Sequence, residues 1–226
     1  MTLDPTAALD PAAREALGKV LELLASERAS VSSVVDERAW QVHVADSLTG
    51  LEIPELRTAS RIADVGAGAG FPGLALAVAL PNAHIDLIES VGRKCEFMER
   101  ATDAAGISNA TALNTRSEDW AAADGRDAYD AVTARAVGRL STLAELASPL
   151  LKPNGVLVAW KGKRDDGEET QLESASEALA MAPEQILDVG NRAGSKHRHL
   201  HVIRKVGPTP PDLPRRPGIA KKRPKG

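Results

Sequence analysis

The chain has 226 residues, of which 43% are hydrophobic, and this is enough for one domain with a sizeable core. It has no run of about 18 apolar residues and no basic-then-apolar leader, so we expect a cytoplasmic protein that does not enter a membrane. The net charge of −3 hides an asymmetry, because residues 194–226 hold ten Lys and Arg and one acid, Asp212. A basic end on an acidic body favours a polyanionic partner, although charge alone fits a solubilising tail equally well.

Two helices are expected before the first strand. Asp10-Pro11 is typical of a helix N-cap followed by proline at the first helical position, and apolar residues then recur at helical spacing to about Arg28. A second helix is expected over residues 36–48, with Trp40, Val44 and Leu48 on one face. We expect residues 1–50 to form an N-terminal helical cap.

Within the second helix, His43, Asp46 and Ser47 stand at positions i, i+3 and i+4 and therefore share one face. Such a polar group could line a cleft above the ends of the strands. The spacing equally allows an exposed helix surface or a local His43–Asp46 pair.

Residues 64–73, Asp-Val-Gly-Ala-Gly-Ala-Gly-Phe-Pro-Gly, lie between an apolar strand and a helix of small residues. Glycines in such a turn let a flat ligand lie against the main chain. Read from Gly68, the loop fits the dinucleotide fingerprint Gly-x-Gly-x-x-Gly. Read from Asp64, the pattern acid-x-Gly66-x-Gly68-x-Gly70 resembles motif I of the class I S-adenosylmethionine (SAM) methyltransferases. SAM carries an ammonium group, which Asp64 could attract.

The next strand, near residues 84–89, ends in Glu89, which lies 19 residues beyond Gly70. In nucleoside sites of βαβ units, an acid about 20 residues after the loop accepts hydrogen bonds from the ribose hydroxyls. NAD and SAM share that ribose. Glu89 therefore predicts a nucleoside without choosing between the two ligands.

The rest of the domain is expected to alternate strands with helices, which is typical of an α/β fold with a mainly parallel sheet. The short loop between the last two strands predicts that they pair antiparallel. A seven-strand sheet of this kind is the Rossmann-like class I methyltransferase architecture, expected over residues 51–207, whereas an oxidoreductase more often continues into another βαβ half. We expect residues 208–226 to form a flexible basic tail. Strands are expected near 61–65, 84–89, 109–114, 129–134, 155–161, 184–189 and 198–206, and helices near 72–80, 91–105, 140–151 and 168–181.

Strand ends in such a sheet point at the ligand. Arg135 and Lys161 each end a strand and are candidates to touch cofactor or substrate, with a surface arginine and a charged turn as the alternatives. The Asn/Asp-Pro-Pro-aromatic motif of enzymes that methylate exocyclic amines is missing after Arg135, and a ring nitrogen needs no such motif. The single cysteine, Cys95, is expected within a helix, away from the substrate. We expect no metal.

Together these features resemble one family, the bacterial 16S rRNA guanine-N7 methyltransferases called RsmG or GidB. The glycine loop with Phe-Pro-Gly and the basic tail are the more specific parts of the resemblance. The matching stretches are His43-x-x-Asp46-Ser47, residues 64–73, Glu89-Ser90-x-x-Arg93-Lys94, Ser117-Glu118, Ala134-Arg135-Ala136, Trp160-Lys161-Gly162, His197-Arg198-His199-Leu200 and residues 214–222.

The resemblance implies SAM as cofactor, with contacts at Gly66, Phe71, Ser117, Glu118 and Arg135, and Glu89 as the ribose acid. It implies methylation of N7 of one guanine in the 530 loop of 16S rRNA, with the small ribosomal subunit as partner. It also implies that loss of activity brings low-level streptomycin resistance. Ser117 as the N-cap of a helix is the structural alternative at that position. We expect a monomer.

Guanine N7 carries a lone pair and no proton, so the expected reaction needs no general base. We expect the enzyme to work by alignment and desolvation, with Asp46 stabilising the cationic product and Arg135 or Lys161 binding a phosphate or guanine O6. Phe71 and Trp40 are the candidates to stack on a base. Two other functions remain open: a nicotinamide-dependent oxidoreductase, and a ribosome-assembly factor that binds RNA without catalysis.

Overall fold

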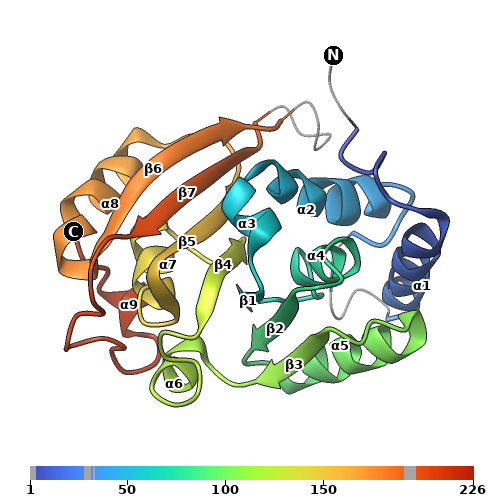
Figure 1. Ribbon diagram of the computed structural model, residues 1–226, viewed down its shortest axis with the longest axis horizontal. Helices are drawn as coiled ribbons and strands as arrows, with labels where there is room; N and C mark the ends of the chain where they lie inside the picture. The colour runs from blue at the N-terminus through green and yellow to red at the C-terminus, as the bar shows by residue number, and fades with distance from the viewer. Residues whose placement is uncertain (1–3, 28–31, 33, 191–196) are drawn as a thin grey trace.

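A seven-stranded sheet with helices on both faces forms the centre of the molecule (Figure 1). The computed structural model describes residues 4–27, 32, 34–190 and 197–226. The strand order is β3-β2-β1-β4-β5-β7-β6. The strands are β1 (Arg61–Val65), β2 (His84–Glu89), β3 (Ala110–Asn114), β4 (Tyr129–Arg135), β5 (Leu151–Lys161), β6 (Met181–Asp188) and β7 (His199–Lys205).

The first five strands are parallel, and β7 runs antiparallel to both of its neighbours, β5 and β6. This confirms the predicted class I methyltransferase sheet. The order reverses between β1 and β4, so the loops after these two strands diverge at the carboxyl edge and leave room for a ligand there.

The four helices expected between the strands are present and differ from the prediction only at their ends, whereas α3 and α9 were not predicted. The predicted helix 140–151 stops at Ala147, with Ser148 as its C-cap, because Pro149 follows and has no backbone N–H to continue the helical hydrogen bonds. The predicted helix 168–181 ends at Leu179, where Ala180 adopts a left-handed conformation. The helices of four or more residues are α1 (Pro11–Ser26), α3 (Pro54–Thr58), α4 (Gly73–Ala79), α5 (Gly92–Ala105), α6 (Ser117–Ala121), α7 (Leu140–Ala147), α8 (Asp166–Leu179) and α9 (Ile219–Lys222).

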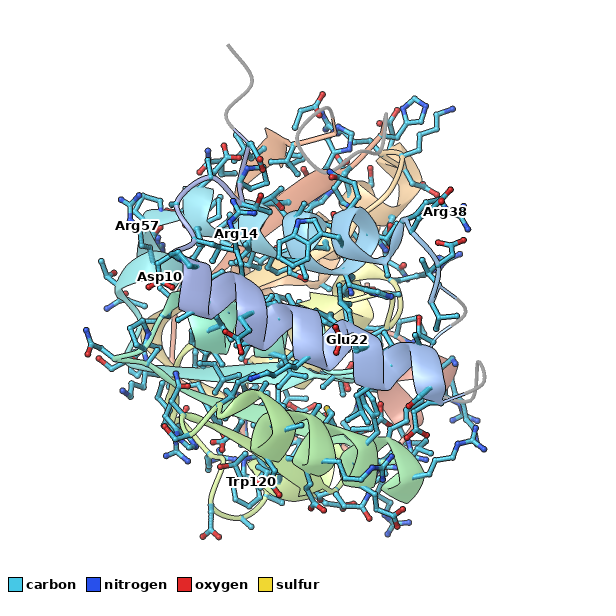
Figure 2. The ribbon with its side chains drawn as sticks, turned by 90° about the vertical axis from the view of Figure 1, so that its right-hand side faces the viewer. Asp10, Arg14, Glu22, Arg38, Arg57 and Trp120 are labelled. Atoms are coloured by element: carbon cyan, nitrogen blue, oxygen red, sulfur yellow. The ribbon has the colours of Figure 1, made fainter. Side chains whose placement is uncertain are left out.

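Each face of the sheet has its own hydrophobic core. One core joins the sheet to α1, α4 and α5, and the other joins it to α7 and α8. Helix α1 begins as predicted, with the Asp10 carboxylate accepting a hydrogen bond from the backbone N–H of Ala13 at 2.7 Å. Figure 2 looks onto its outer face, which carries Asp10 and Glu22.

The predicted helix 36–48 is not one regular α-helix. It consists of a π-helix, η1 (Trp40–Ala45), followed by α2 (Asp46–Leu48) and a 3₁₀ turn, η2 (Thr49–Glu52). A π-turn is wider than an α-turn, and it is found most often at functional sites. Every residue from 43 to 50 is buried, so the polar face expected from the spacing is not a solvent-exposed helix surface.

The basic tail does not extend freely from the domain, as the sequence suggested, but packs across it. Leu213 and Ala220 are 3% exposed, and Arg215 donates through Nε to the buried carboxylate of Glu145 at 2.6 Å. Helix α9 lies beside α7 and near α6 (Figure 1). The composition predicted disorder because prolines and glycines bury little apolar surface. The two buried side chains and the ion pair with Glu145 hold the tail against the domain instead.

Candidate functional site

The loop after β1 is shaped by three glycines with left-handed backbone. Gly66, Gly68 and Gly70 have φ values of +69°, +61° and +84°. A Cβ on Gly66 would lie 2.7 Å from a methyl group of Val137, so a side chain there would force a local shift. A Cβ on Gly68 would meet only one backbone oxygen, at 3.8 Å. The loop therefore presents open main chain at the carboxyl edge, as a flat ligand requires.

Asp64 holds this loop from below rather than facing a ligand. Its side chain is 1% exposed, and its two carboxylate oxygens accept hydrogen bonds at 2.9 Å from the backbone N–H of Gly73 and the hydroxyl of Thr133. Burial raises the pKa of Asp64 to about 6. The expected contact with an ammonium group is thus not supported, because the Asp64 side chain is buried and its carboxylate joins the start of α4 to β4.

Beside the loop, a cavity of about 210 Å³ opens at the ends of β1, β2 and β3. Glu89 lines it, and its carboxylate accepts hydrogen bonds from the backbone N–H groups of Gly68, at 3.1 Å, and Val91, at 2.9 Å. These bonds fix the carboxylate in one orientation and leave lone pairs for further donors, such as the two hydroxyls of a ribose. The other lining residues are Val65, Gly66, Ile88, Ser90, Thr115, Arg116, Ser117, Glu118, Val137, Thr142, Leu146 and Lys221.

Ser117 and Glu118 lie in the wall of the same cavity, at the first turn of α6. Arg116, not Ser117, is the N-cap residue, so the alternative role for Ser117 is wrong. The Ser117 hydroxyl donates to Glu118 Oε2 at 3.2 Å. Glu118 Oε1 accepts a hydrogen bond from the backbone N–H of Gly218 in the tail at 2.7 Å. The cavity thus combines an apolar floor with carboxylate acceptors, which suits an adenosine group.

A second cavity of about 400 Å³ lies across the end of β4 from the first. Ala136 lines the second cavity and Val137 the first, so one residue step separates them. The second cavity is lined by Ser32, Val34, Val42, His43, Arg135, Ala136, Trp160, Lys161, Gly162 and Arg198.

A carboxylate between two guanidinium groups dominates the second cavity. Arg135 donates to Asp46 Oδ2 and to the carbonyl of Val42, both at 2.9 Å. On the other side, Arg198 Nε lies 2.7 Å from Asp46 Oδ1. The Asp46 side chain is only 2% exposed, and each of its oxygens faces an arginine. Asp46 therefore positions the two arginines, and its expected contact with a cationic product is not supported.

His43 is brought to the same cluster by the π-helix. Its Nε2 donates to the carbonyl of Val34 at 2.9 Å, and its Nδ1 faces Arg135 Nη2 at 3.4 Å. Burial lowers the pKa of His43, so the ring is neutral at pH 7. The ring stacks on Phe71 of the glycine loop, with 5.0 Å between centroids. This stack joins the glycine loop to a residue of the second cavity, and it occupies the Phe71 ring, which the sequence offered for base stacking.

Trp40, the other aromatic candidate, lies under the guanidinium of Arg14 at 5.9 Å, so its ring contacts α1 rather than the second cavity. Ser47 also turns away, because its hydroxyl donates to the backbone carbonyl of His43. The two residues support the helical cap, and neither offers a surface to a nucleic-acid base.

Lys161 lines the second cavity, as its place at the end of β5 predicts. Its ammonium group lies 2.7 Å from Glu168 Oε1 and donates to the carbonyl of Gly138 at 2.9 Å. Its charge is thus partly neutralised within the protein. Cys95 is buried in α5, and burial raises the pKa of its thiol, so it is not a poised nucleophile.

Sequence reasoning missed three residues of this site. Trp160 donates from Nε1 to the carbonyl of Asp46 at 2.9 Å and so fixes the helical cap to β5. Arg198 directly precedes β7, which is antiparallel to β5 and therefore begins at the edge of the sheet where β5 ends. The predicted antiparallel pairing could thus have placed Arg198 at the site. Lys221 reaches the first cavity from the tail, about 100 residues from the nearest predicted site residue in that wall, Glu118.

Residues 18–200 match the GidB family, described as rRNA small subunit methyltransferase G. The chain is 34% identical over 201 residues to the ribosomal RNA small subunit methyltransferase G of Bacillus subtilis, covering 88% of this chain and 84% of that protein. It is 40% identical over 186 residues to the protein of the same name in Rubrobacter xylanophilus, covering 80% of this chain and 71% of that one.

Among solved structures, the fold is similar to that of the [4+2]-cyclase SpnF, with a TM-score of 0.59 and 19% identity over 88% of this chain and 96% of that one. It is also similar to fibrillarin from Aeropyrum pernix with natively bound S-adenosyl-L-methionine, with a TM-score of 0.55 and 12% identity over 70% and 72% of the two chains. A likeness at this identity concerns the fold.

Proposed function

The chain belongs to the rRNA small subunit methyltransferase G family, and on that premise we propose that it transfers the methyl group of SAM to N7 of one guanine in the 530 loop of 16S rRNA. It is a SAM-dependent rRNA methyltransferase. The observation that carries the assignment of roles is the pair of cavities on either side of the β4 end, one suited to a nucleoside and one lined by arginines.

The first cavity is assigned to the adenosine part of SAM. Three features fit that group: the open main chain at Gly68, the fixed Glu89 carboxylate for the ribose hydroxyls, and Ser117 with Glu118 for the adenine. When bound, SAM supplies an electrophilic methyl group on a sulfonium. Contacts of Phe71 and Arg135 with SAM, implied by the family, and of Gly70, from the glycine pattern, stay predictions.

The second cavity is assigned to the target nucleotide. Arg135 and Arg198 present N–H donors of the kind that bind phosphate oxygens or the O6 of guanine. Asp46 holds both guanidinium groups in place, and Lys161 adds a third cation at the rim. Bases in RNA are usually recognised in unstacked loops, which fits a target in the 530 loop.

The chain's contribution to the chemistry is alignment. Guanine N7 needs no deprotonation, and the neutral His43 ring, bonded at both nitrogens, is not free to act as a general base. Orientation of two bound reactants can lower a barrier by roughly 7–11 kcal/mol at the extreme. We therefore expect kcat to be flat from about pH 6 to 8, the range in which a tuned general base titrates. A step in kcat there that does not follow RNA affinity would contradict the base-free mechanism.

The test uses tritiated SAM with two substrates: small ribosomal subunits and naked 16S rRNA, both from a strain that lacks this gene. The expected result is stoichiometric transfer to one guanine of the 530 loop, recovered as 7-methylguanosine after nuclease digestion. Binding of NADH without binding of SAM would support an oxidoreductase instead. Binding of the subunit without methyl transfer would support a non-catalytic assembly factor.

A further inference from the structure

The C-terminal tail reaches the cavity assigned to adenosine. The tail leaves β7 at the amino edge of the parallel strands, where Lys205 pairs with Met181 at the start of β6. It ends at the opposite edge, where Lys221 lines the cavity beside Ser117 and Glu118. The tail therefore runs from one edge of the sheet to the other, past α6 and α7 (Figure 1).

Specific contacts hold the tail along this path. Near its start, Thr209 donates to Asp127 Oδ1 at 2.8 Å, and the fully buried Lys205 bonds both residues. Midway, the Arg215 guanidinium grips Glu145, whose side chain is 3% exposed. A guanidinium that pairs with a buried carboxylate is a fixed anchor rather than a solvated charge.

At its end the tail contacts the acid of the cavity wall directly. The backbone N–H of Gly218 donates to Glu118 Oε1 at 2.7 Å. Gly218 has a φ of +79°, a left-handed conformation that favours glycine. The Glu118 carboxylate is thereby fixed through one oxygen. Lys221 then stands one turn further on, at the same cavity.

We propose that the C-terminal tail is part of the cofactor site: Lys221 binds the adenosine group of SAM, and Arg215 positions the tail so that it can. The inference rests on the proposed function. Adenine offers ring nitrogens that only accept hydrogen bonds, and its amine and the ribose hydroxyls donate. Glu89 and Glu118 can accept from those hydroxyls and that amine. Two cations line the described part of the cavity, Arg116 and Lys221, and either can donate to a ring nitrogen.

The test measures SAM affinity by calorimetry for the full-length protein and two alanine variants. Lys221→Ala is expected to raise the Kd for SAM about tenfold, the effect of one lost hydrogen bond to a charged donor. Lys222→Ala is the matched control, because it removes the same charge from the next residue of α9, which does not line the cavity. Its Kd should stay within about twofold of wild type.

Arg215 is a positioning residue and needs a kinetic readout. Arg215→Met should raise the KM for SAM and leave kcat at saturating SAM unchanged, and Arg215→Lys should restore part of the KM. Circular dichroism would show whether the Met variant folds, and the Lys221 pair decides the case if it does not. Equal affinities for the Lys221 and Lys222 variants would overturn the inference, whereas a wild type that binds no SAM would overturn the proposed function.

Discussion

The two cavities at the carboxyl edge are built in different ways. The one assigned to SAM is walled by backbone and by acids that backbone N–H groups fix, and most of it comes from residues 64–118. The one assigned to RNA is held by charges from three distant segments, with Asp46 between Arg135 and Arg198. The shape of the first cavity therefore depends mainly on local chain geometry. The second cavity depends on the pairing of one carboxylate with two arginines, which loss of any one of the three would disrupt.

The largest effect is expected from breaking that pairing. Asp46→Asn removes the carboxylate that both arginines share, and breaking a buried ion pair costs about 3–5 kcal/mol. We expect a loss of this size in unfolding free energy and a fall in methyl transfer of about 100-fold, since misplacement of this kind can cost that much. Urea unfolding and initial rates measure the two effects.

Asp36→Asn is the control for this variant, because Asp36 also pairs with an arginine, Arg38, but both side chains are at least half exposed. An exposed pair contributes about 0–1 kcal/mol. If the Asp46 and Asp36 variants lost equal stability, the charge cluster would not hold the second cavity together.

The glycine loop offers the next test, since its order should depend on sterics rather than charge. Gly66→Ala brings a Cβ to 2.7 Å from Val137, in addition to the strain of a left-handed φ. Gly68→Ala carries only that strain, about 1–2 kcal/mol. Without ligand, the Gly66 variant should unfold at clearly lower urea than the Gly68 variant. Identical midpoints would contradict the steric account of the loop.

The buried Asp64 carboxyl beneath the glycine loop predicts a dependence of folding stability on pH. Its pKa is raised to about 6 in the folded chain, against 3.8 for an ordinary carboxyl, so the folded state holds the proton more strongly. The resulting stability is present below about pH 4 and is lost as pH rises through 6. At about 1.4 kcal/mol per pKa unit, the loss is of the order of 2–3 kcal/mol.

Asp64→Asn removes this titration, and Asn can still accept from the N–H of Gly73. The difference in unfolding free energy between wild type and variant should therefore change between pH 4 and 6 and be constant above pH 7. A difference that is constant across the whole range would show that Asp64 is not titrating there.

The smallest effect concerns RNA affinity at the tail surface. Arg216 and Arg223 are exposed. If both contact phosphates, each adds about 0.7–0.9 to the slope of log affinity against log salt. Replacing both by alanine should lower the slope by roughly 1.5, measured by filter binding over several salt concentrations. An unchanged slope would restrict the tail to its role in the cofactor site.

The difference between the local first cavity and the long-range second cavity also decides what could be predicted from the sequence. The glycine loop, Glu89 and the alternation of strands with helices follow from short motifs, because each depends on neighbours within about 20 residues. Asp64 was found, but its structural bond to Gly73 was not predicted, since that bond depends on how the loop folds back. Arg198 and Lys221 lie in stretches that resemble the family, but neither was assigned to the site, because only tertiary folding brings them to the two cavities. The tail was expected to be disordered because its composition cannot show that Arg215 pairs with Glu145 of the domain.

The central claim is that this enzyme makes 7-methylguanosine in the 530 loop of 16S rRNA. Mass spectrometry of 16S rRNA tests it most directly, in a strain deleted for the gene and in the same strain carrying either the wild-type or the Asp46→Asn gene. The account predicts that the modification disappears on deletion, returns with the wild-type gene and stays low with the variant. An unchanged level of 7-methylguanosine in the deletion strain would contradict it.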